Sequence, residues 1–313
     1  MNNKQVHIFF AIDDNYAPFF KIAVKSMMMN SNNNYHYNIY ILHTDLSESV
    51  KESILSVSQE NYTINFVDMS EKIKYIKEKL HTRDYYSKAI YFRLFIPTMF
   101  PHLDKALYLD SDIVIPGDIS ELYNTDLGTN LVGAIPDEAV SYVEEFIEYV
   151  NKYLGVHHTK YFNSGILLMN LKELRKFDFE NKFISLLNQI AFTVAPDQDY
   201  LNCICKDRVT YVSRVWNKQP FPSDEFTIDN INLIHYNLTA KPWHYDVLYK
   251  EVFYKYAEEL GLAEQMKHLK ENYTDEQKQN DAMGEKSLRK LCHHLANVED
   301  TYVALKASGK IKI

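Results

Sequence analysis

Short apolar runs alternate with helical patterns along the first 240 residues of the chain. A short apolar run between polar turns is typical of a buried strand, whereas apolar residues spaced three and four apart indicate a helix. The runs predict strands over 6–12, 38–43, 63–68, 105–109, 113–115, 131–135 and 165–171, and the helical patterns predict helices over 18–29, 47–59, 70–80, 87–96 and 144–153. Strands and helices in this order form a mainly parallel sheet flanked by helices. We therefore predict an α/β fold, with ligands at the carboxyl ends of the strands.

The composition fits an ordinary globular protein, with 46% hydrophobic and 24% charged residues among 313. A net charge of −8 argues against a general nucleic-acid binder. Three cysteines cannot build a disulfide framework, which favours a reducing compartment. The first apolar run lacks a signal-peptide cleavage site, and no run is long enough to span a bilayer. We expect a cytoplasmic protein, and attachment to the inner face of a membrane stays open.

The character of the chain changes near residue 262. The strand–helix alternation belongs to 1–262, whereas 263–313 is polar and helix-prone, with a strand expected only at 311–313. One face of the predicted helix in this segment carries Leu288, Leu291, Leu295 and Val298. We expect one α/β domain over 1–262 and a helical extension over 263–313. The extension either packs on the domain or a second copy, or contacts a membrane or partner.

Two carboxylates one residue apart interrupt the apolar stretch LYLDSDIVI (107–115). On extended backbone, the i, i+2 spacing points Asp110 and Asp112 the same way. Two such oxygen donors at a strand end suit a hard divalent cation, Mg²⁺ or Mn²⁺. The alternative is a polar turn between strands, but burying two like charges without a counter-ion is costly.

Four further motifs are weaker signals when each is taken alone. His235 ends the apolar run 231–234, where a histidine is more often a satisfied core residue than a ligand. The segment 197–202 opens a short helix, at which an acidic residue is also a plain structural choice. The turn 161–165 is polar and enters a buried strand, and the turn 11–16 follows the first strand. Neither a dinucleotide-binding glycine pattern nor a P-loop occurs in the chain, so both sites are unsupported.

Taken together, these motifs resemble the retaining glycosyltransferases of family 8, which include bacterial lipopolysaccharide galactosyl- and glucosyltransferases and glycogenin. The matching pieces, in the family's order, are FAIDDNY (10–16), FRLFIP (92–97), LYLDSDIVI (107–115), YFNSGILLMNL (161–171), DQDYLN (197–202) and IHYNLTAKPWH (234–244). The resemblance implies a GT-A fold, which is a Rossmann-like central sheet flanked by helices. It also implies a UDP-sugar donor, most often UDP-galactose or UDP-glucose, a saccharide or glycoconjugate acceptor, and Mn²⁺ or Mg²⁺ as the cofactor.

The resemblance also assigns roles to individual residues. The cation ligands are Asp110, Asp112 and His235. The uridine-binding turn comprises Ala11, Asp13, Asn15 and Tyr16, whose ring can stack on the base. Arg93 matches an arginine near the donor phosphates and sugar, and Lys241 matches a contact to the diphosphate. Asn163 and Asp197 match contacts to the donor sugar, and Gln198 matches the residue beneath the anomeric carbon. The predicted donor site further includes Ser111 and Ser164. The sequence departs from the family at Leu238, where the family has glycine, and a different path of the loop 236–241 is therefore expected.

The residue chemistry agrees with this assignment. Glycosyl transfer expels a diphosphate, whose growing charge a cation stabilises as a Lewis acid. Gln198 is a neutral amide and a poor nucleophile, which favours acceptor attack on the face from which UDP departs. Through the resemblance, Asp197 and Gln198 are the expected catalytic residues.

Two interpretations from other classes compete with this one. Asp110-Ser111-Asp112 followed by β-branched residues also satisfies the pattern of HAD-type phosphatases, in which Asp110 would be the phosphorylated nucleophile. A non-catalytic nucleotide-sugar-binding protein is the second alternative.

Overall fold

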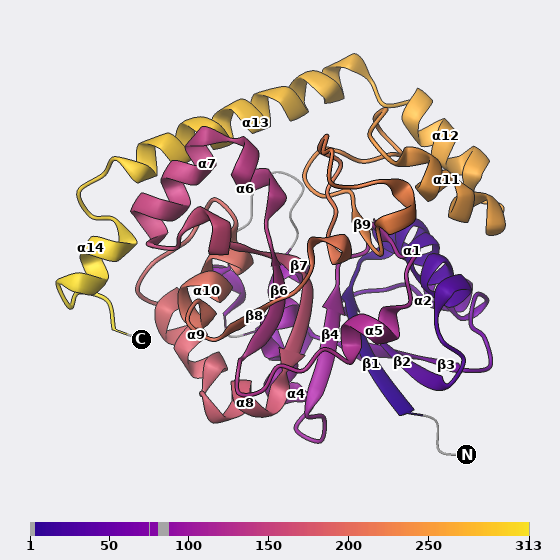
Figure 1. Cartoon of the computed structure of the whole chain (residues 1–313), viewed down its shortest axis with the longest axis horizontal. Coiled ribbons are helices and arrows are strands. Elements are labelled where there is room, and N and C mark those ends of the chain that lie inside the picture. Colours follow the sequence, from indigo (N-terminus) through magenta and orange to yellow (C-terminus); the bar gives the residue numbers. More distant parts are fainter. Residues whose placement is uncertain (1–3, 75, 81–87, 313) are drawn as a thin grey trace. The chain divides into compact units, whose positions relative to one another are not determined.

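The computed structural model describes residues 4–74, 76–80 and 88–312 (Figure 1). The chain divides into two compact units, each built from three stretches of sequence. The first unit comprises Met1–Ser70, Ala106–Asp126 and Ser213–Gln279, and the second comprises Glu71–Lys105, Leu127–Val212 and Asn280–Ile313. The boundary expected at residue 262, between a catalytic domain and an extension, stays a prediction.

Parallel strands form the centre of the first unit. They are β1 (Lys4–Ala11), β2 (Tyr35–His43), β3 (Tyr62–Asp68) and β4 (Lys105–Leu109), in the order β3-β2-β1-β4. Figure 1 shows β1, β2 and β3 side by side, and their register pairs Ala11 with Leu42 and His43 with Asp68. Strand β1 also pairs with β4, Phe9 opposite Tyr108. Because these strands are parallel, the turn after Ala11 and the turn after Leu109 lie at the same edge of the sheet.

A second, two-stranded sheet completes the first unit. Strand β5 (Ile113–Val114) pairs antiparallel with β9 (Ile234–His235). The helices of this unit are α1 (Ala17–Asn30), α2 (Glu48–Leu55), α5 (Ile119–Tyr123), α11 (Lys250–Glu259) and α12 (Ala263–Glu271). Val114 and Ile234 belong to one buried apolar cluster with residues of α1, α11 and α12. In that cluster Phe19 stacks on Trp243 with ring centroids 3.7 Å apart, so the short sheet rests on a packed core.

The second unit has its own strands, β6 (Val132–Pro136), β7 (Phe162–Asn170) and β8 (Val209–Tyr211), in the order β7-β6-β8. Strand β6 is antiparallel to β7 and parallel to β8. The helices include α4 (Ile96–Met99), α6 (Glu138–Tyr142), α7 (Glu144–Glu148), α8 (Leu171–Lys176), α9 (Phe179–Leu187), α10 (Pro196–Cys205) and α14 (Tyr302–Ala307). Helix α13 (Asp275–Ala296) belongs to this unit from Asn280 onward. The fold class is therefore α/β, as the alternation predicts.

Several predicted helices are wrong in type or length. The helix predicted over 70–80 is only a short turn, α3 (Ser70–Ile73), followed by a 3₁₀ turn at Lys77–Lys79, and residue 75 lies outside the described residues. The helix predicted over 47–59 ends at Leu55, and the Ser47 side chain makes no capping hydrogen bond.

The segment around Pro97 also differs from the prediction. The sequence predicts a helix over 87–96 that Pro97 ends, whereas Lys88–Phe95 is a 3₁₀ helix and Pro97 lies in the first turn of α4. Proline is tolerated there because the first turn has no intrahelical partner for an N–H. Residue 87 lies outside the described part of the chain.

The last helices of the chain are confirmed, with a shifted buried face. The buried residues of α13 are Leu288, Cys292 and Ala296, whereas Val298 lies beyond the helix end. From residue 263 to residue 312 the chain has no strand, so the strand expected at 311–313 is wrong over its first two residues, and residue 313 is not described. Among the helices of the described residues, none combines the length and apolarity needed to cross a membrane.

Candidate active site

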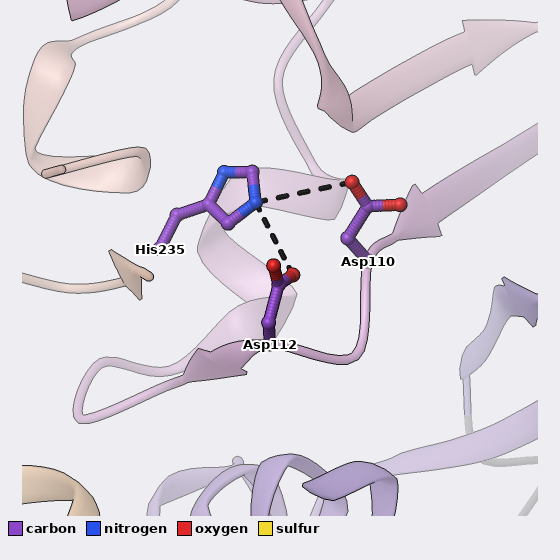
Figure 2. Close-up of side chains that lie close together, drawn as sticks. All are labelled: Asp110, Asp112 and His235. Carbon is purple, nitrogen blue, oxygen red and sulfur yellow. Dashed lines mark ion pairs between the residues drawn. The ribbon is translucent and has the colours of Figure 1, made fainter. Parts of the chain in front are cut away.

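Three side chains from three strand ends converge in the first unit. Asp110 follows β4, Asp112 precedes β5, and His235 ends β9. The pairing of Ile113 with His235, and a hydrogen bond from the Tyr236 N–H to the Asp112 carbonyl (2.9 Å), bring the histidine to the aspartate pair. Its Nε2 lies 3.3 Å from Asp112 Oδ1 and 3.8 Å from Asp110 Oδ2 (Figure 2). We call Asp110, Asp112 and His235 the cation cluster.

The geometry of the cation cluster fits a divalent cation. One ligand atom from each of the three residues lies within 4.8 Å of the other two. Ligands held about 2.1 Å from a cation lie about 3 Å apart at right angles and about 4.2 Å apart when opposite. Two carboxylates and one imidazole suit Mn²⁺, because imidazole favours transition metals and carboxylate favours hard ions. In the described part of the chain, this is the one group of at least three such side chains close enough to share an ion.

Lys241 adds a fixed positive charge to the cation cluster. Its ammonium group donates to Asp112 Oδ2 and to the carbonyl of Tyr236, and the side chain is buried. Burial alone would raise the pKa of Asp112, but the positive charge of Lys241 beside it outweighs burial and holds that pKa well below its usual range. Asp112 is therefore ionised at neutral pH, with Oδ1 toward His235 and Oδ2 toward Lys241.

The turn after β1 lies at the same edge of the parallel sheet as Asp110. Ala11 ends the strand, and Asp13 Oδ1 accepts a hydrogen bond from the Tyr16 N–H (3.0 Å). The half-buried Tyr16 ring meets Phe19 edge-on at 5.6 Å, whereas Asn15 is exposed. The first unit thus brings the predicted uridine-binding turn and the predicted cation ligands to one edge, as strand order requires.

A buried polar network surrounds Gln198 in the second unit. The Gln198 Nε2 donates to Asp137 Oδ2 (2.9 Å), and its Oε1 accepts from the Ser164 N–H (2.9 Å) and from Asn163 Nδ2 (3.3 Å). Asn163 Nδ2 also donates to Asp137 Oδ2 (3.0 Å). A backbone N–H only donates and a carboxylate only accepts, so these two partners fix which way the amide faces.

Arg93 and Asp197 belong to the same unit. The Arg93 Nε lies 3.3 Å from Asp197 Oδ2, and the guanidinium donates to the carbonyls of Ser164 (2.5 Å) and Ile90 (2.9 Å). Both side chains are almost fully buried, so the pair is an internal ion pair rather than a surface one. It ties the 3₁₀ segment Lys88–Phe95 to the start of β7 and to α10.

Comparison with known proteins identifies the family of this chain. The family model described as glycosyl transferase family 8 matches residues 7–247. The chain belongs to glycosyltransferase family 8.

Individual relatives agree with this family. A lipopolysaccharide 1,2-glucosyltransferase of Escherichia coli strain K12 is 27% identical over 275 residues, which is 80% of this chain and 77% of that protein. The galactosyltransferase LgtC, solved with donor and acceptor sugar analogues, superposes with a TM-score of 0.68 at 28% identity, over 81% of this chain and 96% of LgtC. The bifunctional glycosyltransferase WbbM superposes with a TM-score of 0.73 at 25% identity, over 87% of this chain, which spans about half (52%) of WbbM.

Family 8 membership confirms the GT-A fold and the glycosyltransferase class predicted from the motifs. The HAD-type phosphatase interpretation of Asp110-Ser111-Asp112 is therefore wrong, because this segment lies within the residues that match the glycosyltransferase family. Ser111, between the two carboxylates, is buried.

Leu238 stands where the resemblance to family 8 implies a glycine. Leu238 has a φ of 53°, in the left-handed region that glycine adopts without steric cost. The loop between Tyr236 and Lys241 therefore holds a leucine in a conformation that glycine favours. The different loop path expected from this substitution stays untested, but the local backbone is glycine-like.

Sequence reasoning missed three buried groups near the predicted site residues. Asp137 caps α6 through Oδ1, which accepts from the Ala139 N–H (3.0 Å), while its Oδ2 holds Gln198. The position of Asp137 directly before a helix predicts the capping role, but no local pattern predicts its contact with Gln198. Asn217 contacts His235, and no local pattern marks it. Asp199 lies beside Gln198, where the sequence indicates only an acidic helix start.

Asp199 is fully buried between two phenols. Tyr161 donates to Oδ1 (2.6 Å), and Tyr149 donates to Oδ2 (2.9 Å). Burial raises the pKa of Asp199 to about 7, although the hydrogen bonds from the two tyrosines lower it in part. Unlike Asp112, this carboxyl has no cation beside it in the described contacts that could offset its burial.

Proposed function

We propose that this family 8 glycosyltransferase transfers galactose or glucose from a UDP-sugar to a saccharide or glycoconjugate acceptor, with retention of configuration and with Mn²⁺ as the preferred cation. The observation that carries the proposal is the convergence of Asp110, Asp112 and His235 beside the turn after β1. A turn for the base and a cation cluster for the diphosphate, at one sheet edge, match the two ends of a nucleoside diphosphate.

Charged side chains of the first unit are placed to stabilise the leaving diphosphate. A bound cation would stabilise the negative charge that grows on the leaving oxygen. Lys241 keeps its ammonium group on Asp112, so a preorganised positive charge is present before the donor arrives. The Tyr108 hydroxyl donates to Asp110 Oδ1 (3.1 Å), which orients the second carboxylate. These contacts support Asp110, Asp112 and Lys241 as diphosphate-site residues.

We assign the hexose contacts to Asn163, Asp197 and Gln198, with Arg93 and Ser164 as their supports. Sugar hydroxyls held by Asn163 and Asp197 fix the orientation of the ring. The Gln198 amide is locked by Asp137 and by the Ser164 N–H, so its oxygen keeps one direction while charge develops on the anomeric carbon. A neutral amide held in one orientation is suited to stabilise the charge on the anomeric carbon, and is poorly suited to attack that carbon as a nucleophile.

Retention then follows from attack on the face that UDP leaves. The acceptor oxygen forms its bond to the anomeric carbon as the bond to the UDP oxygen breaks. The acceptor proton passes to an oxygen of the leaving diphosphate, so no protein nucleophile is needed. The names of the relatives, a lipopolysaccharide glucosyltransferase and a galactosyltransferase, support a hexose donor and an acceptor in lipopolysaccharide or a surface glycan. A cytoplasmic location, and contact of 263–313 with a membrane or a second copy, stay predictions.

A panel of UDP-sugars tests the proposal directly. The purified chain is incubated with UDP-galactose, UDP-glucose, UDP-N-acetylglucosamine and UDP-xylose, with Mn²⁺ or with a chelator, and released UDP is measured. We expect release from one of the two hexose donors, strongest with Mn²⁺ and lost with the chelator. Asp112→Asn should abolish release, whereas Asp126→Asn, at an exposed position of the same unit, should not.

Two results would contradict the proposal. Release that survives both chelation and Asp112→Asn would remove the cation cluster from catalysis. Tight UDP-sugar binding without release from any donor, with a range of saccharide acceptors present, would support the non-catalytic nucleotide-sugar-binding alternative instead.

A further inference from the structure

Three consecutive polar residues, Asn217, Lys218 and Gln219, are buried beside β9 in the first unit, with 2%, 0% and 0% of their surface exposed. Buried polar side chains are normally hydrogen-bonded, and a run of three calls for a structural or functional reason. No part of the proposed reaction uses them. We call residues 217–219 the buried polar segment.

The backbone of the buried polar segment holds β9 from the side opposite β5. The Lys218 N–H donates to the Leu233 carbonyl (3.0 Å), and the His235 N–H donates to the Lys218 carbonyl (2.9 Å). Lys218 and Ile234 form a parallel bridge, while β5 pairs with the other edge of β9. The backbone of His235 is therefore held on one side by Lys218 and on the other side by strand β5.

The Lys218 side chain is itself held by several contacts. Its ammonium group donates to the carbonyls of Gln219 (2.5 Å) and Phe221 (2.7 Å), and lies over the rings of Phe226 and Tyr249 at 5.6 and 5.7 Å. Carbonyl oxygens and aromatic faces stabilise a cation that water cannot reach. The turn after Asn217 is closed by these contacts, which keeps the Asn217 side chain on the histidine.

Asn217 touches the ring nitrogen of His235 that faces away from the aspartates. Asn217 Oδ1 lies 3.0 Å from His235 Nδ1, and both residues have only 2% of their surface exposed. An amide oxygen only accepts, so this contact requires a proton on Nδ1. The opposite nitrogen, Nε2, is the one directed at Asp110 and Asp112 (Figure 2).

We propose that Asn217 is a positioning residue that keeps His235 protonated at Nδ1, so that the Nε2 lone pair is available to a cation held by Asp110 and Asp112. The opposite tautomer would direct an N–H at the cation and abolish the third ligand. Partners on the outer nitrogen of a ligating histidine fix both its tautomer and its ring orientation. This inference rests on the proposed cation cluster, but it concerns a residue that is not itself a member of that cluster.

Three variants separate positioning from plain stability. Asn217→Leu keeps the branching at Cγ, adds some volume and removes the acceptor, whereas Asn217→Asp keeps an acceptor toward Nδ1. Ser26→Ala is the matched control, because Ser26 is fully buried in the same unit and its hydroxyl accepts from the Ile115 N–H (2.8 Å) and donates to the Ala23 carbonyl (2.6 Å), neither of which belongs to the cation cluster. Its loss removes a buried hydrogen bond without touching the cation cluster.

The readouts are the affinity for Mn²⁺ alone, by calorimetry without any sugar nucleotide, and the protonation of the His235 nitrogens, by ¹⁵N NMR of the metal-free protein. We expect Asn217→Leu to weaken Mn²⁺ binding by about 10-fold to 100-fold. Asn217→Asp should keep Mn²⁺ affinity near that of wild type, and Ser26→Ala should leave it unchanged. In wild type, the NMR signals should show a proton on Nδ1.

Each contrary outcome has a distinct meaning. Wild-type Mn²⁺ affinity in Asn217→Leu, or equal losses in Asn217→Leu and Asn217→Asp, would overturn the role of Asn217. A bare Nδ1 in the wild-type spectrum would overturn it independently of any metal. Failure of the wild-type protein to bind Mn²⁺ would instead refute the cation cluster, and the NMR result would still decide the tautomer.

Discussion

The buried carboxyl of Asp199 should make this protein less stable as the pH rises from 4 to 7. Asp199 has none of its surface exposed and accepts hydrogen bonds from Tyr149 and Tyr161. Burial raises its pKa to about 7 in the folded protein, against an ordinary value of 3.8. Replacing it by asparagine keeps the shape of the side chain and removes the titration.

The size and sign of the effect follow from linkage. Between pH 4 and pH 7 the folded state keeps the Asp199 proton, whereas the unfolded chain releases it. The folded state therefore binds more protons, and the free energy of unfolding falls as the pH rises through this window. A shift of about 3 pKa units corresponds to about 4 kcal/mol, since each unit is worth about 1.36 kcal/mol. Above pH 7 both states are ionised and the contribution of this group stays constant.

Urea unfolding at half-unit steps from pH 4 to pH 8 measures this effect. The stability of Asp199→Asn minus that of wild type should rise by about 4 kcal/mol from pH 4 to pH 7 and then level off. Asp207→Asn, at an exposed position of the same unit, is the matched control, and its curve should run parallel to that of wild type. A difference curve for Asp199→Asn that is flat across the window would refute the claim that burial keeps this carboxyl protonated.

Three further substitutions test the rest of the account. Gln198→Ala should lower kcat strongly while donor affinity changes little, because the amide acts on charge that develops during transfer; an unchanged kcat in steady-state assays would remove Gln198 from the mechanism. Leu238→Gly should raise the free energy of unfolding by up to about 1 kcal/mol. The relief of about 1–2 kcal/mol of strain in the left-handed backbone conformation outweighs the entropy that glycine adds to the unfolded chain. A lower melting temperature would contradict this and would mean that the packing of leucine outweighs the strain. Lys241→Met should weaken UDP binding without weakening Mn²⁺ binding in the absence of UDP, because the ammonium no longer shares Asp112; equal losses in calorimetric titrations of both ligands would contradict this.

Local patterns predicted much of the fold and the centre of the site. The predicted strand over 105–109 has the same bounds as β4, because a short apolar run between polar turns is typical of a buried strand. The i, i+2 pair at Asp110 and Asp112 follows that strand directly, so its position at a sheet edge could be predicted from neighbouring residues alone. Six motifs in the family's order and spacing are together specific enough to indicate family 8 from the sequence.

Local patterns do not predict contacts between segments that are far apart in the sequence. Asp137 and Gln198 are 61 residues apart, and Asn217 and His235 are 18 apart, yet each pair shares a buried hydrogen bond. A polar residue in a loop carries no local sign that the fold will bury it against a partner. The start of β7 could not be predicted for the same reason, since Asn163 and Ser164 are polar but satisfied inside the second unit.

Short helices failed for a different physical reason. A helix of one or two turns gains little from its own hydrogen bonds, so packing decides whether it becomes α, 3₁₀ or a turn. The residues around Pro97 show this, because a 3₁₀ segment and a short α-helix replace the single helix expected there.

The central claim is that Asp110, Asp112 and His235 hold a divalent cation against a nucleoside diphosphate. Crystals grown with Mn²⁺ and UDP, measured at the manganese absorption edge, test it most directly. We expect one anomalous peak about 2.1–2.3 Å from an oxygen of each aspartate and from His235 Nε2, with UDP phosphate oxygens as further ligands. A manganese peak elsewhere in the molecule, with these three side chains turned apart while UDP is bound, would contradict it.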